Sequence, residues 1–348
     1  MNKILSFLFI LSISFYYIIV TQVDIRGNFF EDGLLLSDDR KYFLSAINNT
    51  YTEESKNYIY YAYNYLMQNI YDDVIIIIIS NTLIFAISFA LFIKSSNLKP
   101  NKFFSLTLLF FPVFFINSLN YKDSLFMSIV LLFFATKKND HLNILTKLII
   151  MSILIYFANG LRLGSSLLFL FSLLSFSILK YFNMNKIVCV IYFVLCTLTF
   201  LFLFDSFLNY LGRSIETYWQ LQLRNVWQIT PFYNVNILIT GLIKSIFQFN
   251  LFSYSNFIVY GEHGYNGFVL KVHYLLFCII YPFILLIIFL RSKCFKLCEF
   301  SIFILFYAII YSYIYGGLIG LRLSCLLVLY LMIKCCFISQ NLIYEKKY

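Results

Sequence analysis

The stretch VIIIIISNTLIFAISFALFI, from Val74 to Ile93, contains no charged residue. As an α-helix rising about 1.5 Å per residue, it is long enough to cross the ~30 Å hydrocarbon core of a bilayer. Ile187 to Phe204 is a second apolar stretch of this kind. The two stretches predict an all-α, polytopic membrane protein.

The composition of the whole chain agrees with this prediction. Of 348 residues, 61% are hydrophobic and 12% are charged, whereas soluble domains have roughly 45–50% and about 25%. A water-soluble globular fold is therefore excluded. The net charge of +10 does not indicate nucleic-acid binding, because basic residues of membrane proteins concentrate in cytoplasmic loops.

The positions of Lys and Arg predict the topology. The apolar stretch Ile4–Val20 follows Lys3 without a cleavage pattern of small residues, so it is predicted to be an uncleaved first helix with a cytoplasmic N-terminus. About ten transmembrane helices, several of them short or broken, place 15 of the 26 cations on the cytoplasmic side with only three of the 16 acids. We expect both termini to be cytoplasmic.

Two long exoplasmic loops complete the expected single membrane domain, 1–348. The first, 21–73, carries nine acids and four bases, a net charge of −5, and its part 57–68 is predicted to form an amphipathic interfacial helix. The second, 205–271, contains two tryptophans and several glycines and is predicted to form a cap on the membrane surface. Neither loop contains cysteine, which excludes a disulfide framework there. No metal site is predicted, because the cytoplasmic cysteines do not have zinc-site spacing.

Three apolar blocks are too long for one helix and too short for two: 103–136, 148–179 and 300–333. Each has a polar break near its middle: 117–123, 159–164 and 316–322. Each break contains one cation and faces the exoplasmic side: Lys122, Arg162 and Arg322. A cation at membrane depth costs roughly 2.5–3.5 kcal/mol on insertion scales, and such residues are usually functional.

Three cations at one predicted depth favour a shared anionic ligand, because Arg offers paired donors to a phosphate and Lys a point charge. Gly160 and Gly164 would allow a close approach of the backbone or tight helix packing. In the alternative interpretation the breaks are ordinary hairpin turns. Lys122 and Arg162 then reach lipid headgroups, and Asp123 neutralises Lys122.

Acidic residues in the exoplasmic loops are candidates for a catalytic base. Asp38 and Asp39 in the first loop could take the proton of an acceptor hydroxyl, or they could be surface charge or part of a helix N-terminus beginning at Ser37. Glu262 and His263, flanked by glycines, are a second candidate pair. The alternative for His263 is a loop histidine with a structural role.

Several elements together resemble membrane glycosyltransferases of the C-type fold and the related polymerases of bacterial surface polysaccharides. The element Asp-Asp-x-x-Tyr-x-x-x-Ala, from Asp38 to Ala46, is similar to the acidic motif in the first exoplasmic loop of that family. The segment 112–125 resembles its Lys-Asp hairpin, and the segment 320–323 its late arginine-bearing hairpin.

The resemblance to O-antigen or capsule repeat-unit polymerases implies an enzyme of the bacterial inner membrane. It would join undecaprenyl-diphosphate-linked oligosaccharides at the periplasmic face by inverting glycosyl transfer, without a cofactor. It implies that Lys122, Arg162 and Arg322 bind the diphosphate and that Asp38, Asp39 or His263 handles the proton. The expected partners are the polyprenyl-diphosphate-linked glycan and membrane lipid, with no nucleic acid, and a chain-length regulator could also bind. Two alternatives stay open: a C-type transferase that adds one sugar from a polyprenyl phosphate, and a flippase for the lipid-linked oligosaccharide.

Overall fold

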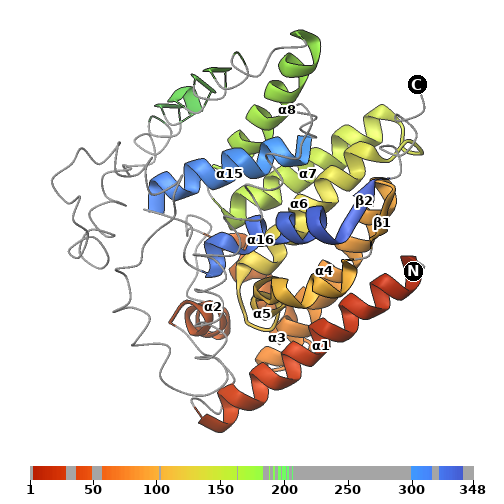
Figure 1. The fold of residues 1–348 in the computed structure, drawn as a ribbon. Coiled ribbons are helices and arrows are strands. Elements are labelled where there is room, and N and C mark those ends of the chain that lie inside the picture. The colour runs from red at the N-terminus through yellow and green to blue at the C-terminus, as the bar shows by residue number, and fades with distance from the viewer. Residues whose placement is uncertain are drawn as a thin grey trace, which may run out of the picture. The chain divides into compact units, whose positions relative to one another are not determined.

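The computed structural model describes residues 3–28, 37–48, 57–101, 103–162, 164–182, 299–315 and 321–339, with scattered helical positions between Val188 and Ser206. The described part of the chain is mostly helical (Figure 1). It divides into two compact units, Met1–Ser166 with His263–Asn266 and Val328–Tyr348, and Leu167–Glu262 with Gly267–Leu327. The single membrane domain stays a prediction, and each unit is described by itself.

The first unit holds most of the described elements. They are α1 (Lys3–Asn28), α2 (Ser37–Ile47), α3 (Tyr58–Gln68), α4 (Val74–Ser95), β1 (Leu98–Pro100), the 3₁₀ helix η1 (Phe104–Phe110), α5 (Phe111–Asn117), α6 (Lys122–Lys138), α7 (Ile144–Leu161) and β2 (Phe337–Ser339). Helix α4 packs against α1, α3 and α6, and α6 also packs against α7. Helix α16 (Leu321–Cys336) contributes its last two turns to this unit.

Three described helices are long and apolar enough to cross a membrane: Phe7–Gly27, Val74–Ser95 and Ile144–Leu161. A fourth span results if 104–117 and 122–138, which meet at a bend of 118°, count as one broken span. On α7, Ile149, Ile153 and Tyr156 are at least half exposed, as expected of a helix whose outer face contacts lipid. Ten spans and two long loops stay predictions, since much of the chain between 183 and 298 lies outside the described residues.

Helix α1 ends at Asn28, eight residues beyond the predicted end at Val20. Polar groups of this extension bond within the protein: the side-chain N–H of Gln22 donates to the carbonyl oxygen of Ser118 at 3.3 Å, and Thr21 accepts from the Ser118 hydroxyl at 3.0 Å. Because these groups have protein partners, the helix continues past the apolar stretch. The first predicted loop, 21–73, therefore begins within α1 and also contains α2 and α3.

The lysine-bearing ends of α4, α6 and α16 lie together. Strand β1, which follows α4, pairs antiparallel with β2, which follows α16. Asn101 reinforces this pairing, because its side-chain amide donates to the carbonyl oxygen of Cys335 at 2.6 Å. From the end of α6, Lys138 Nζ donates to the Ser96 hydroxyl at 3.2 Å. These loops were all predicted on the cytoplasmic side, and within the unit they occupy one end.

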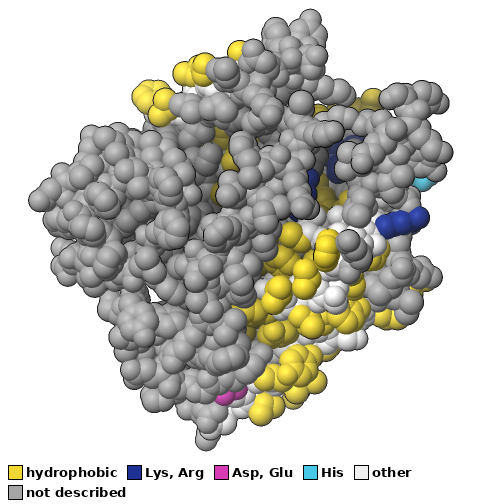
Figure 2. All heavy atoms as spheres, in the orientation of Figure 1, with side chains coloured by type: hydrophobic (Ala, Val, Ile, Leu, Met, Phe, Trp, Pro, Cys, Tyr) yellow, Lys and Arg dark blue, Asp and Glu magenta, His cyan; other side chains and the backbone are white. Residues whose placement is uncertain are grey.

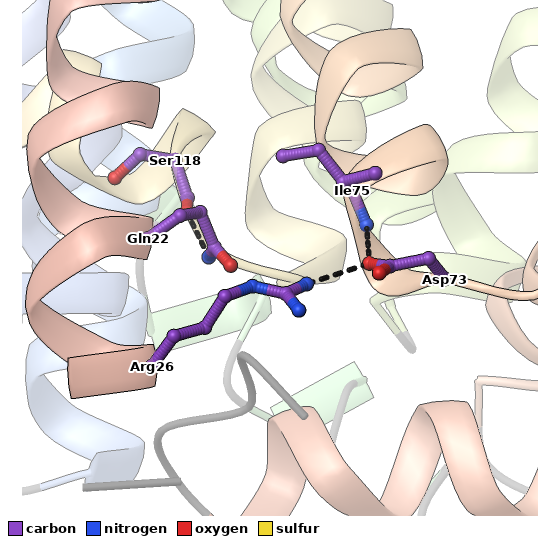
Figure 3. A network of polar contacts seen from close by, with 5 residues as sticks. All are labelled: Gln22, Arg26, Asp73, Ile75 and Ser118. Carbon is purple, nitrogen blue, oxygen red and sulfur yellow. Dashed lines mark hydrogen bonds and ion pairs between the residues drawn. The ribbon is translucent and has the colours of Figure 1, made fainter. Parts of the chain in front are cut away.

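At the opposite end, the last turn of α1 is joined to the start of α4 (Figure 3). Arg26 Nη2 lies 2.7 Å from Asp73 Oδ1, and both side chains are about one-third exposed. The same Asp73 oxygen caps α4 by accepting from the amide N–H of Ile75 at 2.9 Å. Both residues were predicted to be exoplasmic, so the two groups of loops separate to opposite ends of the unit.

The surface of the first unit shows the same separation of basic and acidic side chains. Figure 2 shows apolar side chains covering the outer face over α1, with Lys or Arg near β1 and β2 beyond one end of this band and an Asp or Glu at the other end. An apolar band between charged ends is the surface expected of a membrane-embedded bundle.

The second unit contains α8 (Ser165–Phe182), apart from its first two residues, and α15 (Glu299–Tyr315). Phe169 of α8 stacks on Phe303 of α15, with ring centroids 4.6 Å apart. Both helices are apolar. Of the predicted break 316–322 in the third block, residues 316–320 lie outside the described residues. Helix α15 ends at Tyr315, just before the predicted break, and α16 begins at Leu321, within it.

Candidate functional site

The break in the first block forms a tight, buried turn. Helix α5 ends at Asn117 and α6 begins at Lys122. Pro112 lies in the first turn of α5, where its missing N–H costs nothing. Asn117, Ser118, Asn120 and Asp123 are fully buried. The predicted break is confirmed, and it places a run of polar side chains inside the protein rather than in water.

The break in the second block lies next to the first. Arg162 follows the last residue of α7 and forms an ion pair with Asp123, and its guanidinium lies 5.4 Å from the centre of the Phe126 ring. The side chains of Arg162 and Asp123 are 6% and 0% exposed. Arg162 is therefore held inside the protein, which contradicts the alternative in which it reaches to the headgroups.

Two glycines shape this second break, as their positions in the sequence suggested. Gly164 has a φ of 82°, a left-handed conformation that glycine adopts without strain. Gly160 lies against α3: a Cβ at this position would be 2.1 Å from Cδ1 of Ile59 and 3.2 Å from its Cβ. The absence of a side chain at Gly160 thus allows α3 to pack closely on α7.

Lys122 begins α6 and is buried, with 8% of its surface exposed. Its Nζ donates to Oδ1 of Asn57, the residue that precedes α3 and has a φ of 77°. Asparagine is among the few residues that adopt this left-handed conformation readily. The contact joins α6 to the start of α3. Lys122, Asp123 and Arg162 are therefore three buried charged residues at the two helix breaks, and they are called the buried charge cluster below.

Beside this cluster lies a network of amides centred on Tyr60. The Tyr60 hydroxyl donates to Oδ1 of Asn120 at 2.7 Å and accepts from Nδ2 of Asn81 at 3.2 Å. Nδ2 of Asn120 in turn donates to Oδ1 of Asn64 at 3.0 Å, and Nδ2 of Asn64 donates to the carbonyl oxygen of Tyr60 at 2.9 Å. Since Asn81 is eight residues beyond Asp73, the network extends about 12 Å along α4 from its acidic end.

Some buried polar atoms of this region have no hydrogen-bond partner among the described residues: Oε1 of Gln22, Oδ1 of Asn81, Nδ2 of Asn117 and Oγ of Ser165. Leaving a buried donor or acceptor unsatisfied costs about 1–3 kcal/mol. Four such atoms around one pair of helix breaks supply both donors and acceptors. Groups of this kind can bind the hydroxyls and phosphoryl oxygens of a polar ligand.

The acidic motif of the first loop is joined to this network through α2. The Tyr42 ring packs edge-on against Tyr60 at 5.0 Å and Tyr61 at 5.4 Å, and Ala46 is fully buried. Asp38 and Asp39 lie in the first turn of α2, with Asp38 one turn before Tyr42. A helix does begin at Ser37, as one alternative expected, but the side chains of Asp38 and Asp39 lie outside the described part of the structure, so the catalytic interpretation is not tested.

The other predicted site residues are not brought into this cluster by the described part of the chain. Arg322 is the second residue of α16, in the second unit, and its side chain lies outside the described residues. Glu262 and His263 lie wholly outside them. Of the three predicted diphosphate ligands, Lys122 and Arg162 are both buried at the two helix breaks, each held by a different partner, and their role as ligands stays a prediction.

Comparisons with known protein families, with curated proteins and with solved structures find no match. The resemblance noted from the sequence therefore stays a prediction.

The amide residues of α3 and α4 were not predicted as part of the site. For Asn81 a signal existed, because Ser80, Asn81 and Thr82 are three consecutive polar residues within the apolar stretch Val74–Ile93. Tyr60 and Asn64 could not be singled out from the sequence, because tyrosine and asparagine occur throughout the first loop.

Proposed function

We propose that this chain is an integral membrane glycosyltransferase that polymerises undecaprenyl-diphosphate-linked oligosaccharides at the periplasmic face of a bacterial inner membrane. The observation that carries the proposal is the buried cluster of Lys122, Asp123 and Arg162. It lies at two adjacent helix breaks and at the end of the first unit opposite to the lysine-bearing loops.

The proposed reaction needs a base and a cationic site for the leaving group. Asp38 or Asp39 takes the proton of an acceptor hydroxyl, with Glu262 and His263 as the other candidates. The acceptor oxygen attacks the anomeric carbon of the donor, the bond to the diphosphate oxygen breaks, and the configuration inverts. Undecaprenyl diphosphate leaves as an anion stabilised by Lys122, Arg162 and Arg322.

Two features support this arrangement. The acidic motif on α2 is anchored to the amide network through Tyr42 and Tyr60, so the base and the cations would share one end of the bundle. The loops predicted to be cytoplasmic and those predicted to be exoplasmic also lie at opposite ends of the first unit. A chain-length regulator would bind as an additional partner.

Replacing Arg162 or Arg322 with Ala in a strain that lacks the chromosomal gene tests the proposal. Both variants should lose the ladder of long glycans, and the ladders are compared at equal amounts of protein in the membrane because loss of Arg162 also breaks a buried ion pair. Lys147→Ala, at the other end of α7, is the matched control and should keep the ladder. Long chains made by both arginine variants would exclude the proposed diphosphate site.

The product and the accumulated intermediate distinguish the alternatives. A ladder of repeats indicates a polymerase, and a single mass increment indicates a transferase that adds one sugar. Single repeat units that accumulate on the outer leaflet of the deletion strain indicate a polymerase. Their accumulation on the inner leaflet would indicate a flippase instead.

A further inference from the structure

At the lysine-bearing end of the first unit, α1, α4 and β2 enclose an apolar groove of about 250 Å³. Its apolar lining comes from all three elements: Ile4, Phe7, Phe89, Ala90, Ile93 and Phe337. The wall is fixed by aromatic packing, because Phe337 lies edge-on to Phe89 at 5.7 Å and to Phe104 at 5.5 Å. The outer edge is open, since Ile4 is 64% exposed.

One charged side chain lines the groove. Lys94, in the last turn of α4, is exposed at its edge. Further lysines lie at the same end of the unit: Lys99, Lys137, Lys138, Lys147 and Lys334. Among the described residues of this end, the only carboxylate is that of Asp140. The groove therefore opens into a strongly positive environment.

We propose that this groove binds one acyl chain of an anionic phospholipid from the cytoplasmic leaflet, with Lys94 contacting the phosphate. The lining matches an acyl chain in being apolar throughout, and the charge at its edge is complementary to an anionic headgroup. Basic pockets between transmembrane helices on the cytoplasmic side are typical sites for such headgroups. The inference rests on the membrane location in the proposed function and not on the polymerase reaction.

The test uses the purified full-length protein in a neutral detergent. Native mass spectrometry measures the binding of phosphatidylglycerol, of phosphatidylethanolamine with identical acyl chains, and of glycerol 3-phosphate. We expect phosphatidylglycerol to bind at least about fivefold more tightly than phosphatidylethanolamine, the factor expected for one lysine near an anionic headgroup. Glycerol 3-phosphate, which lacks the acyl chains, should not bind. Equal binding of the two phospholipids, or binding of glycerol 3-phosphate, would overturn the proposal.

Three variants localise the site. Lys94→Gln should remove the preference for phosphatidylglycerol, whereas Lys99→Gln, an exposed lysine outside the groove, should keep it. Ala90→Leu should fill part of the groove and weaken the binding of both phospholipids. An equal effect of Lys94→Gln and Lys99→Gln would mean that only diffuse charge attracts the lipid. Because these are binding measurements, their failure would leave the proposed polymerase untouched.

Discussion

The ion pair between Arg162 and Asp123 can be tested by a double-mutant cycle. Both side chains are almost fully buried, so removal of either partner leaves an uncompensated charge inside the protein. Breaking a buried pair in this way costs about 3–5 kcal/mol. We expect Arg162→Leu and Asp123→Leu each to lower the stability of the protein by that amount. The double variant should recover most of the loss, because apolar replacement of a buried pair is often neutral or stabilising.

The assay combines stability with product. Thermal unfolding in detergent, followed by the fluorescence of a C-terminal tag, measures the three variants against the wild type, and the glycan ladder measures their activity. If Arg162 binds the diphosphate, the double variant is stable but makes no long glycan. A double variant that restores the full ladder would show that the pair only holds two helix breaks together. Single variants within about 1 kcal/mol of the wild type would refute the burial argument itself.

Three further predictions concern the surroundings of this pair. Tyr60→Phe removes a hydroxyl that joins Asn81 and Asn120 and should destabilise the protein by about 1–3 kcal/mol. The control is Tyr63→Phe, because the Tyr63 ring stacks on Tyr60 at 5.9 Å. Equal melting temperatures of the two variants would contradict the hydrogen-bond network. Gly160→Ala should lower the stability by about 1–3 kcal/mol, because the new methyl group clashes with Ile59. Adding Ile59→Ala should restore part of this loss in the same melting assay. No recovery would show that the loss comes from the backbone conformation of Gly160 and not from the clash. Arg26→Ala should lower the stability by less than about 1 kcal/mol, because its ion pair with Asp73 is partly exposed. This difference in stability should become smaller in high salt. A difference that salt does not change would contradict the partial exposure of the pair.

Much of the helical framework was predictable from the sequence. The stretch Val74–Ile93 predicted α4 almost to the residue, because an uncharged, mainly apolar segment of this length that spans a bilayer satisfies its backbone hydrogen bonds as a helix. The breaks at 117–123 and 159–164 were also predicted, since asparagine, glycine and charge within apolar blocks interrupt a span. The helix predicted over 57–68 is confirmed as α3.

The sequence alone did not predict which polar side chains contact each other. Asp123 lies next to Lys122 in the chain, and adjacency alone suggests that they neutralise each other. The structure pairs Asp123 with Arg162, 39 residues away, because successive residues of a helix point in different directions. The same limit applies to Tyr60 and Asn120, which are 60 residues apart in the chain.

The energetics of the buried charges bear on why the chain retains them. Polar and ionisable groups inside a membrane protein are expensive, and leucines could fill the space of Arg162 and Asp123 at no loss of stability. Stability alone therefore does not account for the pair. An arginine held by a carboxylate is already oriented, and an arriving diphosphate need only compete with Asp123 for its donors. Asp123 would then limit how tightly Arg162 binds an anion. Asp123→Asn keeps the shape of the side chain and removes the competing charge. This variant should therefore bind anionic ligand more tightly and release the leaving group more slowly.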